Sequence, residues 1–312
     1  MLVSLAFGSR AIPLGEVLGA LFAGVDSDNA TVITSQRLPR TGLGIAAGFA
    51  LGMSGALMQA HTRNPLADPG LFGVNAGATF AVAVLVFGFG IAAPAALVAA
   101  ALVGAAVVAT LVFLLGLRGV RGGGMVMLAI VGTTLGALLA SLTSAMVLLD
   151  RNTLDVLRFW EVGSISLRNT DLLSLVAPLY LLGVVLAVAN AFSLNALGLG
   201  DEVAQSLGTS VRSARVVGIL AITLLAGTTT AICGPIGFLG LVAPHLARAV
   251  TRHDQRWLVP LSGLAGVSIL LFADTAGRFV LERVELEVGI AMALIGAPIL
   301  LLLTRSRRLV PL

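Results

Sequence analysis

The sequence predicts an all-α fold, a polytopic bundle of helices that spans a lipid bilayer. Three observations lead to this prediction. Of the 312 residues, 58% are hydrophobic and 11% are charged, whereas soluble domains contain about 25% charged residues. The apolar residues form successive runs of the length that a helix needs to cross a bilayer, about 20 residues. Polar segments that hold most of the charges separate these runs.

The composition also excludes several functional classes. Every basic residue is Arg, and the arginines are scattered singly, so no basic stripe for nucleic acid forms. The chain has no Lys and therefore no P-loop for hydrolysing nucleotides. The single cysteine, Cys233, cannot form an internal disulfide, and the Cys and His spacings fit no metal site. We therefore expect no enzyme activity, no cofactor and no metal in this chain.

Nine apolar segments are expected to span the membrane, within one transmembrane domain that comprises residues 1–312. Residues 1–8 are apolar but too short to cross, so they are expected to be the outer half of a truncated first helix. The nine segments are 42–62, 72–90, 93–117, 125–148, 172–192, 213–233, 237–252 (short), 258–280 and 288–304.

The segment 42–62 is built for close helix packing. It carries Gly44, Gly48 and Gly52 at four-residue spacing. This strip has almost no side-chain bulk, so we expect the backbone of a neighbouring helix to approach it closely.

Two of the polar segments are long enough to have structure of their own. Residues 150–171 contain an Arg-Phe-Trp sequence that is typical of a helix at the membrane interface. In residues 193–212, Asp201 or Ser193 could cap a short helix, and Gly208 could end it in the left-handed conformation. A second short helix is then expected to begin near residue 209.

The distribution of charges favours a cytoplasmic C-terminus. This orientation puts more arginines inside than outside, as the positive-inside rule requires, and most acidic residues outside. Residues 150–171 then lie outside the cell membrane and residues 193–212 in the cytoplasm.

Several polar residues have both a functional and a structural interpretation. Ser141, Thr143 and Ser144 could line a translocation path or form hydrogen bonds to neighbouring helices. Asp274 and Arg278, four residues apart, could form an ion pair on a helix surface, or Arg278 could face outside water and help a soluble partner to dock.

Two further groups of residues also have two interpretations each. Arg37 and Arg40 could anchor the chain at the headgroups or bind an acidic partner. In the loop Asn64-Pro65-Leu66, proline fixes the turn, and Leu66 could pack locally or plug a pore from the inside.

Eight motifs follow one another along the chain. They are RLPRT (37–41), SGALMQ (54–59), RNPLADPGLFGVNAGA (63–78), LRFWEVGS (157–164), LGLGDEVAQSLG (197–208), GPIGFLGLVAPHLAR (234–248), LLFADTAGR (270–278) and LIGAPILLLL (294–303). Read together, they resemble the motifs of the permease subunits of iron–siderophore, haem and vitamin B12 ABC importers, from residue 1 to about residue 310. The resemblance is greatest to permeases for ferric enterobactin and related catecholates.

The resemblance implies a ten-helix type II importer permease that works as a dimer in the inner membrane. It implies that Arg37, Arg40 and Arg278 meet glutamates of a periplasmic or lipoprotein substrate-binding protein. It also implies that Asn64, Pro65 and Leu66 form part of a cytoplasmic gate. Residues 199–215 are expected to lie in a cleft of the ATPase subunit, and the coupling residues there are Asp201, Glu202, Gln205, Ser206, Leu207 and Gly208.

The implied partners are an ABC ATPase dimer, which alone binds ATP-Mg, and a second permease subunit that is identical or homologous. Membrane lipid and a ferric siderophore are the other implied ligands, and the resemblance leaves vitamin B12 or haem as alternative cargo. Glu287 stands where most family members have proline, which puts the bend of the last helix in question. From another class, an ion-coupled secondary carrier would need an ionisable group near the midplane.

Overall fold

The computed structural model describes residues 1–8, 12–23, 27–118, 124–166, 171–251, 254–280 and 285–305. Within these ranges the regular structure is entirely helical, which confirms the all-α prediction. One helix stands at each of the nine predicted segments. These helices are α4 (Leu38–Thr62), α5 (Val74–Phe89), α6 (Pro94–Arg118), α7 (Gly124–Leu149), α9 (Asp171–Gly198), α11 (Val211–Cys233), α12 (Leu239–Thr251), α13 (Gln255–Val280) and α14 (Val288–Arg305).

Six of the described helices are long and apolar enough to cross a membrane. They are the helices that contain α4, α6, α7, α9, α11 and α13. The apolar helices α5 and α14 are shorter, and α12 has 13 residues, in agreement with the short seventh segment predicted from the sequence.

The N-terminal region contains more helix than the sequence suggested. Helix α1 (Leu2–Ala6) occupies the predicted stub, and α2 (Leu14–Leu18) and η1 (Gly19–Ala23) follow it. Helices α3 (Asp28–Val32) and η2 (Ile33–Arg37) then run without a break into α4, giving one helix of 35 residues.

Pro39 lies inside this helix, which begins earlier than the predicted residue 42. Proline lacks an N–H and clashes with the carbonyl four residues before it. Here the carbonyl four residues before Pro39 belongs to Ser35, inside the wider π-helical turn η2, and such turns accommodate a break in the usual hydrogen bonding.

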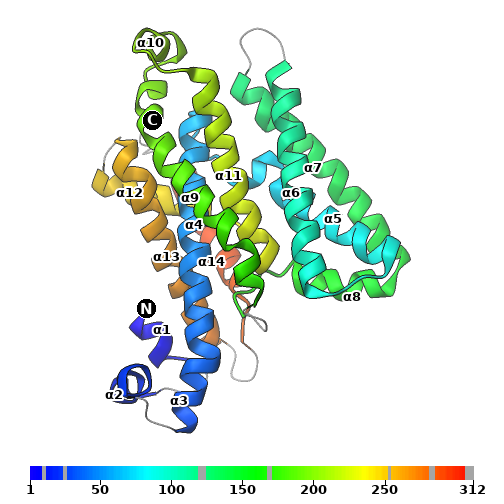
Figure 1. Cartoon of the computed structure of the whole chain (residues 1–312), viewed down its shortest axis with the longest axis vertical. Coiled ribbons are helices and arrows are strands. Elements are labelled where there is room, and N and C mark those ends of the chain that lie inside the picture. Colours follow the sequence, from blue (N-terminus) through cyan, green and yellow to red (C-terminus); the bar gives the residue numbers. More distant parts are fainter. Residues whose placement is uncertain are drawn as a thin grey trace.

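Helix α4 lies at the centre of the bundle (Figure 1). It packs against α13 along much of its length and also contacts α9, α11 and α12. Helices α5, α6 and α7 pack on one another as a second group, which α11 joins to the rest.

The close packing predicted for the glycines of α4 is confirmed at two of the three positions. A Cβ on Gly48 would lie 2.7 Å from the Val267 Cα, and one on Gly52 would lie 2.1 Å from the Ser262 carbonyl oxygen. Both neighbours are backbone atoms of α13. At Gly44 the neighbour is instead the Leu271 side chain, 2.8 Å away.

The two structured polar segments lie far apart: the one at 193–212 is at the top of Figure 1, and the one at 150–171 is at the lower end of the group formed by α5, α6 and α7. Helix α8 (Arg151–Trp160) forms in the segment 150–171, and Asp150 caps it by accepting a hydrogen bond of 2.8 Å from the Thr153 N–H. The Thr153 hydroxyl and N–H stabilise the charged carboxylate and thereby lower the pKa of Asp150.

Helix α10 (Asp201–Ser206) forms in the segment 193–212, but its capping differs from the expectation. Its N-cap is Gly200, whereas Ser193 lies inside α9, which continues to Gly198. Gly208 ends the helix with φ +82°, as predicted. The expected second short helix is not separate, because α11 begins at Val211 and continues as the span.

Candidate functional site

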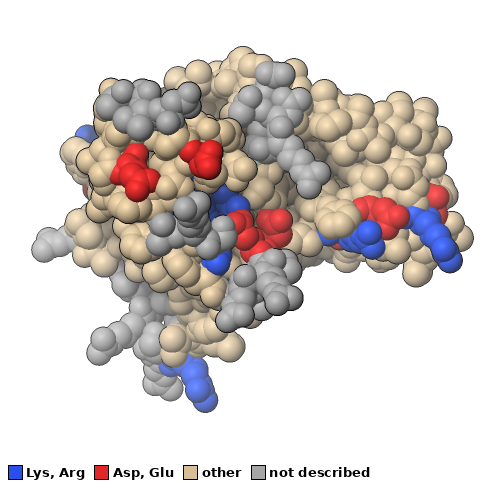
Figure 2. All heavy atoms as spheres, turned by 90° about the horizontal axis from the view of Figure 1, so that it is seen from below, with Lys and Arg blue, Asp and Glu red and all other residues tan. Residues whose placement is uncertain are grey.

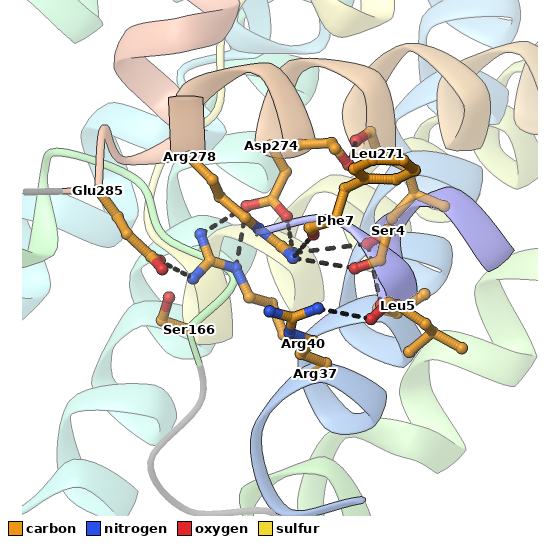
Figure 3. Close-up of polar contacts among 12 residues, drawn as sticks. Ser4, Leu5, Phe7, Arg37, Arg40, Ser166, Leu271, Asp274, Arg278 and Glu285 are labelled. Atoms are coloured by element: carbon orange, nitrogen blue, oxygen red, sulfur yellow. Dashed lines mark hydrogen bonds and ion pairs between the residues drawn. The ribbon is translucent and has the colours of Figure 1, made fainter. Parts of the chain in front are cut away.

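Three arginines that the sequence marked for docking converge at the end of the bundle opposite α10. Arg37 ends η2, Arg40 lies in the first turn of α4, and Arg278 lies in the last turn of α13. Figure 3 shows their side chains around Asp274. In Figure 2, which views the lower end of Figure 1, acidic and basic side chains adjoin in the middle of a largely uncharged face.

Arg37 and Arg278 bind the C-terminal carbonyl groups of α1. Arg37 Nη1 donates to the carbonyls of Leu5 (2.7 Å) and Ala6 (3.0 Å). Arg278 Nη1 donates to those of Ser4 (2.9 Å) and Phe7 (3.1 Å). The last carbonyls of a helix lack partners within it and carry partial negative charge, so two guanidinium groups stabilise this end.

Asp274 holds two of these arginines together. Its side chain is fully buried and accepts a hydrogen bond from Arg278, its neighbour one turn along α13. Its Oδ1 accepts two more from Arg40, from Nε at 3.0 Å and from Nη2 at 2.7 Å. A buried carboxylate requires such pairing, because an isolated charge in the interior is costly.

Arg40 has a second acidic partner on the solvent side. Its Nη1 donates to a carboxylate oxygen of Glu285, which precedes α14. The side chain of Glu285 is 43% exposed, whereas that of Arg40 is 12% exposed. Three arginines and two acids leave this cluster with one net positive charge (3 − 2 = +1).

The expectation that Arg278 faces outside water is wrong for this structure, since the residue is only 5% exposed. Arg37, at 6%, is equally buried. The alternative for Asp274 and Arg278, an ion pair four residues apart, is what the structure contains, although the pair is buried and not on a helix surface. The sequence did not predict the ion pair of Arg40 with Glu285 or the hydrogen bonds to the α1 carbonyls, because both kinds of contact depend on the tertiary fold.

At the other end of the bundle, the predicted gate loop follows α4 directly. Arg63 closes α4 in the left-handed conformation, with φ 49°. The Asn64 side chain accepts a hydrogen bond of 3.0 Å from the Leu66 N–H, which tightens the turn at Pro65. Leu66 and Pro65 are half-buried, and Asn64 is exposed.

An ionic cluster joins this gate loop to α10. The Asp201 carboxylate, in the first turn of α10, accepts hydrogen bonds from Arg63 at 2.8 Å and from Arg215 of α11. Arg63 also donates to the Leu197 carbonyl near the end of α9, at 2.6 Å. The sequence marked Asp201 but missed both arginines, which lie 138 and 14 residues away from it.

The predicted coupling residues form an exposed surface on α10 and the turn after it. Gly208 N–H bonds to the Gln205 carbonyl and Thr209 N–H to the Ala204 carbonyl, each at 2.9 Å, the pattern of a Schellman turn. Leu207 is 63% exposed. The other exposed side chains of this surface are those of Glu202, Val203, Gln205 and Ser206.

The candidate path residues lie on α7. Ser141 and Ser144 are exposed, and each bonds to the carbonyl four residues earlier in its own helix, at 2.9 Å. Thr143 is buried, and its hydroxyl has no hydrogen-bond partner among the described residues. In the same described part of the chain, no group of three or more His, Cys, Asp or Glu side chains could hold a metal ion.

Comparison with known proteins relates the whole chain to one family. The model of the FecCD transport family matches residues 1–306. The ferric enterobactin transport system permease protein FepD of Escherichia coli (strain K12) is 43% identical, over 98% of this chain and 91% of that protein. The Fe(3+)-citrate import system permease protein YfmD of Bacillus subtilis (strain 168) is 38% identical over the same shares.

A haemin permease and a solved structure complete the comparison. The hemin transport system permease protein HmuU of Yersinia pestis is 36% identical, over 87% of this chain and 82% of that protein. The solved structure is an inward-facing conformation of a putative metal-chelate type ABC transporter. It matches with a TM-score of 0.82 and 27% identity, over 98% of this chain and 94% of that chain.

Proposed function

Because the chain belongs to the FecCD transport family, we propose that it is the permease subunit of an ABC importer that carries a ferric siderophore across the inner membrane. The observation that carries this proposal is the match to siderophore permeases over nearly the whole chain. The chain is a transport subunit, and ATP-Mg is bound and hydrolysed by a separate ATPase dimer.

The proposed cargo is a ferric catecholate of the enterobactin type. Identity to the ferric enterobactin permease is 43%, above the 36% to the haemin permease, and it extends over more of the chain. Haem and vitamin B12 are the alternative cargoes within the family.

We place the α10 end of the bundle in the cytoplasm, with the C-terminus, and the arginine cluster at the periplasmic surface. Asp201, Glu202, Gln205, Ser206, Leu207 and Gly208 then bind the ATPase. Their exposure supports this assignment, because a mixed apolar and acidic surface on a protruding helix is available to a partner. A second permease subunit, identical or homologous, completes the path, which Ser141, Thr143 and Ser144 line.

The ionic cluster suggests how movement of α10 reaches the gate. Asp201 binds Arg63, and Arg63 immediately precedes Asn64, Pro65 and Leu66. When the ATPase subunits close on nucleotide, a displacement of α10 pulls on Arg63 and so on the gate loop. The importer alternates between an outward-open and an inward-open conformation. ATP can shift the equilibrium between them only because the two conformations bind ATP with different affinities.

At the periplasmic surface, we propose that a loaded substrate-binding protein docks on the cluster of Arg37, Arg40 and Arg278. The net positive charge of the cluster suits glutamates on that partner. Arg37 and Arg278 are bound to carbonyl groups of α1. Arg40 therefore makes the direct contact with the binding protein, and the other two arginines fix the position of α1 at this surface.

Uptake by proteoliposomes tests the proposal. The permease is reconstituted with its ATPase and binding protein and supplied with radioactive ferric enterobactin, haemin or vitamin B12. We expect uptake of ferric enterobactin that requires ATP inside the vesicles. Preferential uptake of haemin or vitamin B12 would correct the cargo, and uptake driven by an ion gradient without the ATPase would support a secondary carrier instead.

A further inference from the structure

The docking cluster contains one ion pair that differs from the others. Arg40 binds Asp274 through Nε and Nη2, and this carboxylate is fully buried. Its remaining terminal nitrogen, Nη1, binds Glu285, which is 43% exposed. Figure 3 shows Arg40 between these two carboxylates. The buried pair fixes the position of the guanidinium, whereas the exposed pair occupies its outward-facing donor.

From this arrangement we propose that Glu285 is an internal stand-in for the carboxylate of the docking partner. In the undocked permease it neutralises Arg40, and on docking a glutamate of the substrate-binding protein takes its place. This proposal rests on the docking role of the cluster and adds to it the residue with which the partner competes.

The two ion pairs of Arg40 differ in how readily they exchange. The pair with Glu285 is open to water on the glutamate side, where the side chain is 43% exposed, and an ion pair that water can reach contributes less than a buried one. Breaking a buried pair is costly, because it leaves a charge uncompensated. A competing carboxylate therefore displaces Glu285 and leaves Asp274 in place, so Arg40 keeps its position throughout.

The backbone around Glu285 allows this exchange by rotation of one side chain. The next residue, Leu286, donates its N–H to the Gly277 carbonyl of α13 at 3.2 Å. Gly289, at the start of α14, donates to the Gly163 carbonyl at 2.9 Å. Because Leu286 and Gly289 are held by these hydrogen bonds, the Glu285 side chain can turn towards solvent while the start of α14 stays where it is.

Replacing Glu285 by glutamine tests the proposal, because the variant keeps the shape and removes the competing charge. The probe is the substrate-binding protein of this importer loaded with ferric enterobactin, and its affinity for the complete importer in lipid nanodiscs is measured by surface plasmon resonance. We expect the binding protein to bind the Glu285→Gln importer about two- to fivefold more tightly at low salt. This is the change in affinity that corresponds to losing a competing solvent-accessible ion pair. The gain should shrink at high salt, where both carboxylates are screened.

Glu287→Gln is the matched control, since Glu287 lies two residues further on and makes no ion pair with a described residue. It should bind as the unmodified importer does. Arg40→Gln should bind more weakly, and adding Glu285→Gln to it should give no gain. An unchanged or weaker affinity for Glu285→Gln would overturn the proposal while leaving the docking site intact. If Arg40→Gln binds normally, the docking assignment itself fails.

Discussion

Replacing Gly52 by alanine should force α4 and α13 apart at a close backbone contact between them. The added Cβ would lie 2.1 Å from the Ser262 carbonyl oxygen, whereas ordinary contact begins at 3.4 Å. Helices α4 and α13 must therefore move apart locally by about 1.3 Å (3.4 − 2.1). Because the neighbour is backbone, no side-chain rotation can relieve the overlap, and overpacking of this kind costs about 1–3 kcal/mol.

Gly42→Ala is the matched control on the same helix. Gly42 is exposed, and a Cβ there would meet no described atom within 4 Å. Alanine in a helix interior gains roughly 0.5–1 kcal/mol over glycine at either position, so this gain cancels in the comparison. We expect Gly52→Ala to be less stable than Gly42→Ala by about 1–3 kcal/mol. Gly44→Ala should fall between them, since the Leu271 side chain can move.

The assay is unfolding in mixed micelles of sodium dodecyl sulfate and a mild detergent, followed by circular dichroism. Equal stability of Gly52→Ala and Gly42→Ala would refute the assignment of this glycine strip to close backbone packing.

Three further predictions concern the two ends of the bundle. Gly208→Val should abolish stimulated ATPase activity, because a β-branched residue is strained at φ +82°; Gly198→Val, in an ordinary helical position with open space, should keep it. Asp201→Asn should lower the cargo moved per ATP hydrolysed, since the link between α10 and Arg63 weakens, whereas Asp155→Asn at the other end should not change this ratio. Because hydrogen bonds from Thr153 hold the folded pKa of Asp150 below its unfolded value, the stabilisation of α8 is present above the unfolded pKa and is lost as pH falls through the folded pKa. The protection factors of residues 151–160, which correct for the pH dependence of intrinsic exchange, should therefore fall on acidification more in the unmodified chain than in Asp150→Asn, and an equal fall in the two would contradict this reasoning.

Sequence periodicity and length predicted most of the fold. The nine apolar segments become helices because burial in lipid requires every backbone group to bond within its own segment. The glycine strip of α4 was predictable for the same local reason, since small residues permit close approach. The early start of the helix that contains α4 was not predictable. Pro39 and its flanking arginines indicate a helix boundary, and the sequence does not reveal the π-helical turn that lets the helix continue through them.

The sites were predictable as residues but not as contacts. Arg37, Arg40 and Arg278 were marked individually, yet their division into two that bind α1 and one that binds two carboxylates depends on α1, α4 and α13 meeting. Arg63 and Arg215 were missed because no local pattern relates them to Asp201. Long-range ionic contacts of this kind leave no periodic signal in the chain.

The most direct test of the account is whether the permease moves ferric siderophore only when its ATPase is bound and supplied with ATP. Proteoliposomes that contain this chain, with the second permease subunit where the importer requires one, are compared with and without the ATPase under an imposed ion gradient. The account predicts accumulation only with the ATPase and ATP. Accumulation against a concentration gradient in its absence would contradict the account.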